Sequence, residues 1–575
     1  MMPRTARLTL VTLLASATVA WLSAAPAQES ESARTDYWSV SPDLWRMTGV
    51  DPQFPETALD EVTKRGADLG VAFSGGGTRS AAATVGQLRG LRRNGWLGQV
   101  RYVAAVSGGA WAAIPFTFSP QDLDVLLGPL GLPPDPEGLR RSLVEEQAPK
   151  GSLARSIADS KLLAPSAAEA SKIYGRANLD KAPLPDELRA LARKFLAGST
   201  DETYANLLGR VFVKPHVPGG TEKRYTWNAA SRDRIKEIDP KLSVADFVTA
   251  ADDRPFLIVG GSMIYMHPAY EHPRLIPVEM TPLYTGVRQQ YGERLGGIYV
   301  RPHAYDVAGA DLVNDHTVRV QVNSARRPFT IADMMATTGA APLLTLFQGK
   351  PLPILTKGTA VFPIFNHFTI REDKPQPVVE NLSHGDGGFT DNLGVMPLLA
   401  RKVHNLIVFV NAKESIIDNP AVESLFWTFD RFEDGGGDRS MNHVFESRRF
   451  EEVKRGLDKA MIGKGAAVYC DRGWEVLKNE FYNVPSYGGL NICWVYNQTV
   501  PSWEKRLPAD TREMLTSRSF RNFPWFSTFG QNIPFVIRLK PAQANLLADL
   551  TEWAITNGID RSNIEKTLGI QRTNP

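Results

Sequence analysis

The sequence predicts an α/β protein with a central, mostly parallel sheet and helices on both faces. Two observations predict this class. Between Asp68 and Phe118, a short apolar run, a glycine turn and a helical pattern follow one another twice. Much later, Leu406–Val410 is an almost continuous apolar run, which is typical of a strand buried on both faces of a sheet.

The two repeated units define the first elements. Asp68–Phe73 is expected to form a buried strand, and a helical pattern follows at Arg79–Arg93, where Asn94-Gly95 is suited to end a helix. A second strand is expected at Arg101–Val106, followed by an apolar helical stretch at Ala110–Phe118. This alternation favours a parallel sheet with covering helices.

The character of the sequence changes at residues 119–243. Prolines cluster at its start, and amphipathic helical patterns follow at Leu184–Leu196 and Tyr204–Val211. We therefore expect an inserted, mainly helical cap at about 119–243, within one α/β domain that spans residues 66–575.

Further elements are expected after the cap. Strand patterns occur at Phe256–Val259 and Val318–Val322, and a helix is expected to begin near Thr330. The glycine-rich tract Glu433–Asp438 is expected to be a mobile loop. The segment Lys540–Ile559 has the pattern of a closing amphipathic helix.

The amino terminus is typical of a secretory signal peptide. Residues 1–27 contain two arginines, a long apolar stretch and the small-residue cleavage site Ala25-Pro26-Ala27. Residues 28–65 then form a polar leader. The expected location is secreted or periplasmic. The competing interpretation is an uncleaved helix that anchors the protein in a membrane.

Charge and composition limit the kinds of partner that the protein is expected to bind. The chain has 575 residues, of which 43% are hydrophobic and 22% charged. Removal of residues 1–27 takes away two arginines and no acidic residue, which lowers the formal net charge from +3 to +1. A nearly neutral chain gives no reason to expect nucleic acid as a partner.

The number and spacing of the cysteines and histidines do not indicate a metal site. The two cysteines, Cys470 and Cys493, form either one disulfide or two buried thiols, and the sequence does not separate these. Two cysteines do not complete a zinc site, and the nine histidines show no ligand spacing. No metal is expected.

Ser107 is the candidate nucleophile. It follows a predicted strand and precedes Gly108-Gly109, which permit a tight turn into a helix. The helix amino terminus favours the negative charge that develops when a serine attacks a carbonyl. Ala105 occupies the first glycine position of the usual Gly-x-Ser-x-Gly turn.

A glycine loop and an aspartate supply the remaining chemistry. Gly75-Gly76-Gly77 offers backbone amides for an oxyanion, and Arg79 follows at the start of a helix. Asp386 lies between Gly385 and Gly387-Gly388. If it is buried against Ser107, it can act as a general base with a raised pKa.

These motifs resemble those of the patatin-like and cytosolic-type phospholipase A superfamily of lipid acyl hydrolases. Ser74–Arg79 is similar to the oxyanion loop of that family with its arginine, and Val106–Gly109 to its nucleophile turn. Asp386-Gly387-Gly388, followed by Asn392-Leu393-Gly394, is similar to its aspartate motif. Pro277–Pro282 resembles a weaker segment of the cytosolic-type branch.

The resemblance implies a serine lipid acyl hydrolase of the phospholipase A or lysophospholipase type. Ser107 would attack the ester and Asp386 would take its proton, while the amides of Gly75, Gly76 and Gly108 stabilise the oxyanion. Arg79 would bind the substrate phosphate or fix the loop. The implied partners are a phospholipid or other acyl lipid and, transiently, a membrane or micelle interface; no cofactor is implied.

Three alternatives remain open. A Ser–Asp–His triad would use His404 or His443, although His404 precedes the apolar strand and is therefore expected at its far end. The same acyl-enzyme could transfer its acyl group to another alcohol. A non-catalytic lipid-binding protein on the same scaffold is the third. His384 is expected at the surface, and the aromatic cluster Leu425–Phe429 is expected in the core rather than in a bilayer.

Overall fold

The computed structural model describes residues 37–47, 52–65, 68–128, 135–146, 148–159, 203–265, 274–291, 295–314, 317–323, 327–341, 363–370, 377–414, 419–427, 441–526 and 539–573. The predicted signal peptide, the helix expected at 184–196 and the glycine-rich tract 433–438 lie outside these residues.

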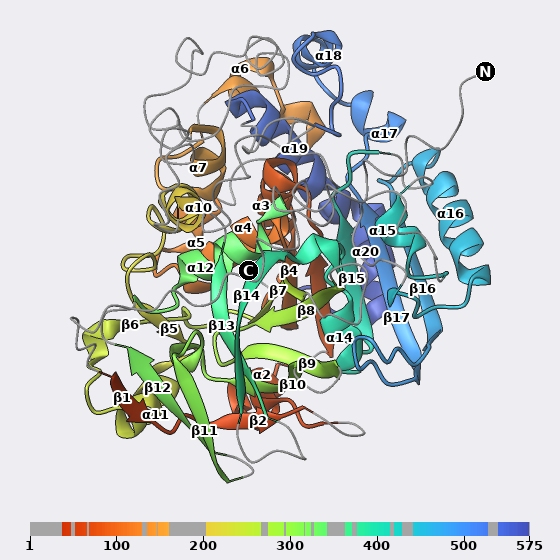
Figure 1. The fold of residues 1–575 in the computed structure, drawn as a ribbon. Helices are drawn as coiled ribbons and strands as arrows, with labels where there is room; N and C mark the ends of the chain where they lie inside the picture. The colour runs from red at the N-terminus through yellow and green to blue at the C-terminus, as the bar shows by residue number, and fades with distance from the viewer. Residues whose placement is uncertain are drawn as a thin grey trace, which may run out of the picture.

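A twelve-stranded sheet forms the centre of the described structure (Figure 1). Its parallel strands are β3 (Leu69–Phe73), β4 (Val100–Val106), β7 (Phe256–Tyr265), β15 (Asn405–Val410) and β17 (Tyr487–Tyr496). Its other strands are β2 (Leu44–Arg46), β8 (Arg274–Met280), β9 (Thr285–Tyr291), β10 (Leu295–Val300), β13 (Ile364–Thr369), β14 (Val378–Asp386) and β16 (Val468–Val476).

The sheet is parallel in the middle and antiparallel on its flanks. The parallel strands lie in the order β17-β15-β3-β4-β7, β16 extends them on one side, and β8-β9-β10-β2 continues on the other. β3, β15 and the body of β4 are almost entirely buried, because helices and connecting segments cover both faces. The predicted α/β class is confirmed.

The helices include the two predicted from the repeated units. The main ones are α3 (Gly77–Arg93), α4 (Gly108–Phe118), α12 (Ile331–Thr338), α14 (Met396–Ala400), α16 (Arg448–Met461), α19 (Pro541–Thr556) and α20 (Gly558–Leu568). The other described α-helices are α2 (Asp60–Thr63), α5 (Leu123–Leu126), α6 (Arg141–Glu145), α7 (Leu153–Asp159), α10 (Thr203–Leu208), α11 (Ala229–Ile238), α15 (Pro420–Glu423), α17 (Pro501–Glu504) and α18 (Ala509–Thr516). None of the described helices has both the length and the apolar character that crossing a bilayer requires.

The segment predicted as a cap is mainly helical where it is described. It contains α5, α6, α7, α10 and α11, and α10 continues into a π-helical turn at Gly209–Val213. Its one described strand, β5 (Arg224–Thr226), pairs with β6 (Phe247–Thr249) just beyond the segment. The boundaries of the cap stay a prediction.

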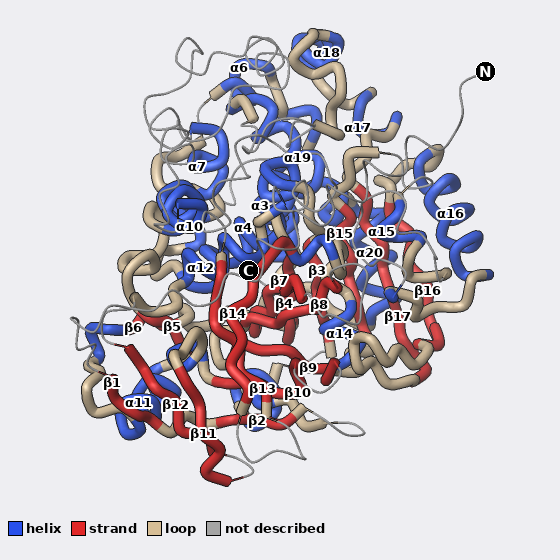
Figure 2. The backbone as a smooth tube through the Cα atoms, viewed as in Figure 1, coloured by secondary structure: helices blue, strands red, loops and turns tan. Residues whose placement is uncertain are grey.

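The strand predicted at Val318–Val322 is confirmed, and it pairs with the amino-terminal segment of the chain. The strand expected at Val318–Val322 is β12 (Thr317–Asn323), which belongs to a separate three-stranded sheet with β1 (Tyr37–Val40) and β11 (Gly309–Asn314) (Figure 2). The supposed leader 28–65 therefore contributes a strand to that sheet, and its β2 joins the central sheet by pairing with β10. Burial of Leu44 and Met47 explains why this polar segment is part of the fold.

The carboxyl-terminal part closes the fold. α19 lies along α3, and the two helices approach so closely that a Cβ on Gly86 would lie 1.9 Å from the carbonyl oxygen of Ala548. Cys470 and Cys493 face each other in the antiparallel pair of β16 and β17 and are joined by a disulfide. Of the two states that the sequence left open for these cysteines, the structure has the bridge.

Candidate active site

Ser107 stands on a sharp turn between β4 and α4. It is the N-cap residue of α4 and has φ 50° and ψ −124°, a conformation that residues with a side chain rarely adopt. Its side chain is 4% exposed. Such a turn raises the serine hydroxyl above the end of the strand and places it at the amino terminus of the helix.

The glycines after Ser107 allow its turn to pack against the glycine loop that follows β3. A Cβ on Gly108 would lie 2.0 Å from the carbonyl oxygen of Gly77, and one on Gly109 would lie 2.7 Å from that of Phe73. Neither position has room for a side chain. The two glycine turns seen in the sequence thus form one interlocked structure.

Asp386 reaches Ser107 because two strands meet end to end. Val106, the last residue of β4, pairs with Gly260 of β7, and Asp386, the last residue of β14, pairs with Gly261. β8 occupies the other edge of β7, so β4 and β14 share one edge and run toward each other. The Ser107 hydroxyl donates a hydrogen bond of 2.8 Å to Asp386 Oδ2.

The environment of Asp386 suits a base. The carboxylate is 3% exposed, and its Oδ1 accepts a 2.7 Å hydrogen bond from the Gly388 N–H. Burial raises the pKa of Asp386 to about 7, although the hydrogen bonds from Gly388 and Ser107 act in the opposite direction. The carboxyl group therefore changes its charge near neutral pH.

Two hydroxyl groups that the sequence analysis missed hold the dyad in place. Thr338, at the end of α12, accepts a 2.8 Å hydrogen bond from the Ser107 N–H and donates one of 2.6 Å to the Gly260 carbonyl. Ser262 donates to the Asp386 carbonyl at 2.9 Å. Neither residue lies in a motif, so only the folded arrangement identifies them.

The backbone amide of Gly75, which the sequence analysis expects to bind an oxyanion, already has a hydrogen-bond partner. Its N–H donates a 2.9 Å hydrogen bond to the backbone carbonyl of Asn392, so this amide is already used. By contrast, the N–H of Gly108, in the first turn of α4, has no acceptor within the described part of the chain. The structure therefore leaves Gly108 available to an oxyanion and occupies Gly75.

Arg79, which follows the glycine loop, is held by two backbone carbonyls. Its Nε donates to the Asn411 carbonyl at 3.2 Å and its Nη1 to the Phe526 carbonyl at 2.5 Å. Burial lowers the pKa of Arg79 to about 10, and nearby Glu414 opposes that shift. These contacts suit the loop-fixing role, but Arg79 also lines the cavity that contains Ser107, so both roles expected for this residue stay predictions.

Asn411, at the end of β15, completes the support of the loop. Its N–H donates to Ser74 Oγ at 2.8 Å, and its carboxamide bonds to Ser80 and Gln87. Because β15 is the neighbour of β3, this side chain meets the loop where β3 ends. The apolar run predicted the strand but gave no sign of this role.

A cavity of about 220 Å³ opens over the dyad. Ser107, Asp386 and Gly76 lie at its base, and Lys413 and Glu414 contribute charge to its lining. Its apolar lining comes from Phe389, Leu393, Val410, Ala341, Ala412, Pro420 and Ala421. The cavity thus offers a polar reaction centre with apolar walls.

The histidines that the structure describes are not among the residues that line this cavity. His404 lies before the start of β15, at the edge of the parallel sheet opposite Ser107, and its Nδ1 is 2.9 Å from Asp68 Oδ2. His443 Nε2 is 3.0 Å from the carbonyl oxygen of Phe445. No histidine is among the residues that line the cavity.

The sequence analysis expects His384 at the surface, but the structure shows it buried. It lies within β14, where it is 1% exposed, and its Nε2 is 2.7 Å from the Tyr305 hydroxyl. Burial lowers the pKa of His384 to about 4. Its place in a paired strand two residues before Asp386 explains the burial.

The aromatic cluster near residue 425 is core where it is described. Leu425 and Phe426 are fully buried, and Trp427 packs edge-on against Phe450. Thr428 and Phe429 lie outside the described residues.

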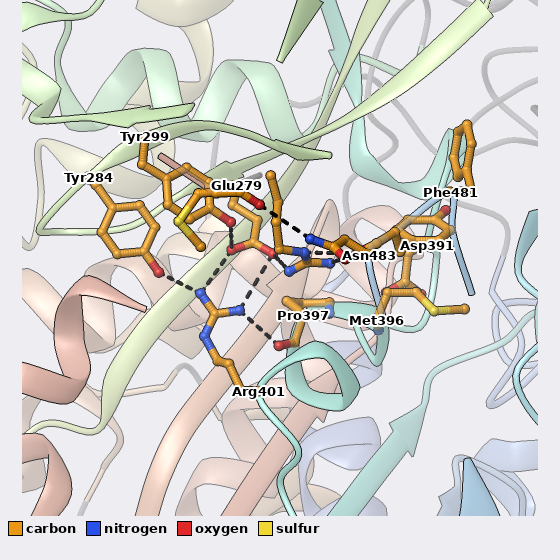
Figure 3. A network of polar contacts seen from close by, with 12 residues as sticks. Glu279, Tyr284, Tyr299, Asp391, Met396, Pro397, Arg401, Phe481 and Asn483 are labelled. Atoms are coloured by element: carbon orange, nitrogen blue, oxygen red, sulfur yellow. Dashed lines mark hydrogen bonds and ion pairs between the residues drawn. The ribbon is translucent and has the colours of Figure 1, made fainter. Parts of the chain in front are cut away.

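The segment Pro277–Pro282 carries a buried ionic network (Figure 3). Arg401 donates to Glu279 Oε2 at 2.9 Å and to Glu56 Oε1 at 2.7 Å. Arg288 and the Tyr299 hydroxyl also bond to Glu279. Burial acts to raise the pKa of Glu279, but Arg288 and Arg401 outweigh it and hold that pKa below its usual value. Glu279, Arg288 and Tyr299 belong to β8, β9 and β10, and none of them is among the described residues that line the cavity.

The fold and this arrangement of serine, aspartate and glycine loop define an α/β protein with the geometry of a serine acyl hydrolase. The family of patatin-like phospholipases matches residues 71–399, and the chain belongs to that family. The resemblance inferred from the motifs is thus confirmed, and membership supports lipid acyl hydrolase activity.

Solved structures of human GIVD cytosolic phospholipase A2 are similar to this chain. Human GIVD cytosolic phospholipase A2 is similar with a TM-score of 0.43 and 11% identity, over 93% of this chain and 70% of that one. Its complex with methyl gamma-linolenyl fluorophosphonate inhibitor and terbium chloride gives 0.39 and 11%, over 95% and 69%. Comparison with curated proteins gives no match.

Proposed function

We propose that this protein is an exported serine hydrolase that cleaves acyl esters of phospholipids or lysophospholipids with a Ser107–Asp386 dyad. The observation that carries the proposal is the 2.8 Å hydrogen bond from the Ser107 hydroxyl to the buried carboxylate of Asp386. A serine needs such a base to become a nucleophile.

In the acylation step, Ser107 Oγ forms a bond to the ester carbonyl carbon while its proton passes to Asp386. The carbonyl oxygen becomes an oxyanion, which the N–H groups of Gly76 and Gly108 and the amino terminus of α4 stabilise. When the tetrahedral intermediate collapses, the bond to the leaving alcohol breaks and that alcohol takes the proton from Asp386.

In the deacylation step, water attacks the acyl-serine and gives its proton to Asp386. The bond to Ser107 then breaks, the fatty acid leaves, and Ser107 recovers its proton. Neither step requires a metal or an organic cofactor. If another alcohol replaces water, the same intermediate gives acyl transfer.

The substrate class follows from the cavity and the family. Apolar walls around a polar centre suit an acyl chain, and the patatin-like phospholipase match supports a lipid ester. Export follows from the predicted signal peptide, and the Cys470–Cys493 disulfide is compatible with an oxidising compartment. The amino terminus of the mature protein would be Gln28.

The test is incubation of the purified protein with defined phospholipids, lysophospholipids and neutral esters, beside Ser107→Ala and Asp386→Asn. We expect fatty acid release by the wild type, and loss by both variants of at least about three orders of magnitude. A fluorophosphonate probe should label the wild type and not Ser107→Ala. Hydrolysis by Ser107→Ala, or failure of the wild type to be labelled, would contradict the proposal.

A further inference from the structure

Asn392 has a carboxamide at the reaction centre with no assigned role. A Cβ on Gly75 would lie 2.3 Å from Asn392 Oδ1 and 3.2 Å from Ser107 Cβ. A Cβ on Gly388 would lie 2.6 Å from the same oxygen and 3.0 Å from Asp386 Oδ1. The carboxamide therefore stands between the glycine loop and the aspartate turn, beside both members of the dyad.

This carboxamide makes no hydrogen bond within the described part of the chain. Only the backbone carbonyl of Asn392 is engaged, by the Gly75 N–H at 2.9 Å. The residue is partly exposed and lines the cavity over Ser107. Because Oδ1 lies against Gly75 and Gly388, Nδ2 is the carboxamide atom that can still donate a hydrogen bond to a bound molecule.

The same contact removes a donor from the oxyanion loop. An oxyanion hole needs preorganised donors aimed at the oxygen that becomes charged, and the Gly75 amide points to Asn392 instead. A nearby side chain with an unused N–H₂ can take its place. Asparagine side chains serve in this way in other hydrolases.

We propose that the Asn392 carboxamide donates a hydrogen bond to the ester carbonyl oxygen as it becomes an oxyanion, in place of the Gly75 amide. This assignment rests on the proposed Ser107–Asp386 hydrolase. It makes the Asn392 segment bifunctional: its backbone carbonyl fixes the glycine loop, while its side chain stabilises the transition state.

The test compares Asn392→Leu, which keeps the size and shape of the side chain, with the wild type. We expect a kcat on a soluble ester lower by about 10²–10³, as for removal of one oxyanion donor, and a KM changed by less than about threefold. Asn381→Leu is the matched control, because Asn381 is an exposed residue of β14 whose carboxamide donates to Asn366 and which is not among the residues that line the cavity. It should keep the wild-type rate.

A trifluoromethyl ketone separates catalysis from structure. Addition of Ser107 to such a ketone creates an oxyanion that mimics the transition state, so Asn392→Leu should lose affinity for it in proportion to its loss of kcat/KM. A side chain with a merely structural role would change both the thermal midpoint and KM instead. Wild-type kcat and ketone affinity in Asn392→Leu would overturn the proposal.

Three further outcomes have defined meanings. If Asn392→Leu unfolds at a lower temperature, Asn392→Asp is the variant that tests the proposal. Because a carboxylate repels an oxyanion, kcat of Asn392→Asp should fall at least as far as that of Asn392→Leu. A fully active Asn392→Asp would overturn the proposal. An active wild type with inactive Ser107→Ala and active Asn392→Leu contradicts only the role of Asn392. An inactive, unlabelled wild type contradicts the hydrolase itself.

Discussion

At the scale of single residues, the proposed Ser107–Asp386 dyad predicts how the activity depends on pH. Asp386 must be deprotonated to accept the serine proton, and burial raises its pKa to about 7. We therefore expect kcat/KM on a neutral ester to rise about tenfold per pH unit below pH 7 and to level off above it. A profile that is flat from pH 5 to 8 would contradict Asp386 as the base.

The same pKa has a consequence for stability. Folding raises the pKa of Asp386 from 3.8 to about 7, so the folded protein favours the protonated form and loses stability as pH rises through that interval. Asp386→Asn removes this loss. Chemical denaturation should show the variant more stable than the wild type above pH 7, by up to about 4 kcal/mol, and equally stable near pH 4. Equal stability at both pH values would contradict the burial argument.

The histidines supply a second prediction about the base. Because His404 lies at the opposite edge of the parallel sheet and His443 bonds to a backbone carbonyl, neither should take part in proton transfer. Replacing each separately by Asn should leave esterase activity nearly intact. A fall of about three orders of magnitude or more in either variant would support a triad instead.

At the scale of secondary-structure elements, the contact between α3 and α19 depends on glycine. A Cβ on Gly86 would lie 1.9 Å from the Ala548 carbonyl oxygen and 2.5 Å from Thr551 Oγ1. Gly86→Ala must therefore push α19 away from α3. We expect a loss of about 1–3 kcal/mol in the free energy of unfolding, measured by chemical denaturation.

The control for that substitution is Gly558→Ala. Gly558 is the first residue of α20, and a Cβ there would meet no atom within 4 Å. The free energy of unfolding should therefore stay within about 0.5 kcal/mol of the wild type. Alanine favours a helix more than glycine does, so a loss in Gly558→Ala as large as that in Gly86→Ala would contradict the argument from the close approach.

At the scale of the whole molecule, Arg401 joins distant parts of the chain. Its guanidinium bonds to Glu56 near the amino terminus and to Glu279 of β8, and its side chain is 1% exposed. Arg401→Met leaves buried carboxylates with fewer partners, so we expect a loss of about 3–5 kcal/mol in the free energy of unfolding. Arg448→Met, which removes an exposed pair with Glu446, should cause no measurable change. Equal effects of the two substitutions would contradict the argument from burial.

Much of the fold could be predicted locally. The apolar runs and glycine turns predicted β3, α3, β4, α4 and β15, because burial and turn geometry depend on residues close in sequence. The strand at Val318–Val322 was also predicted, but alternation shows only that a strand is half-buried and does not show that β12 joins a separate sheet with β1 and β11. His384 was misplaced for a similar reason: burial depends on partners far away in the chain.

The sequence by itself determined the class of fold, the family and the residue types that a serine hydrolase needs, because each motif is a short segment with its own chemistry. Only the tertiary structure decided how these pieces meet. Ser107 and Asp386 are 279 positions apart, and they touch because β4 and β14 share one edge of β7 and end there head to head. The engagement of the Gly75 amide, the support from Thr338 and the position of Asn392 also arise from contacts between distant segments, which no local pattern encodes.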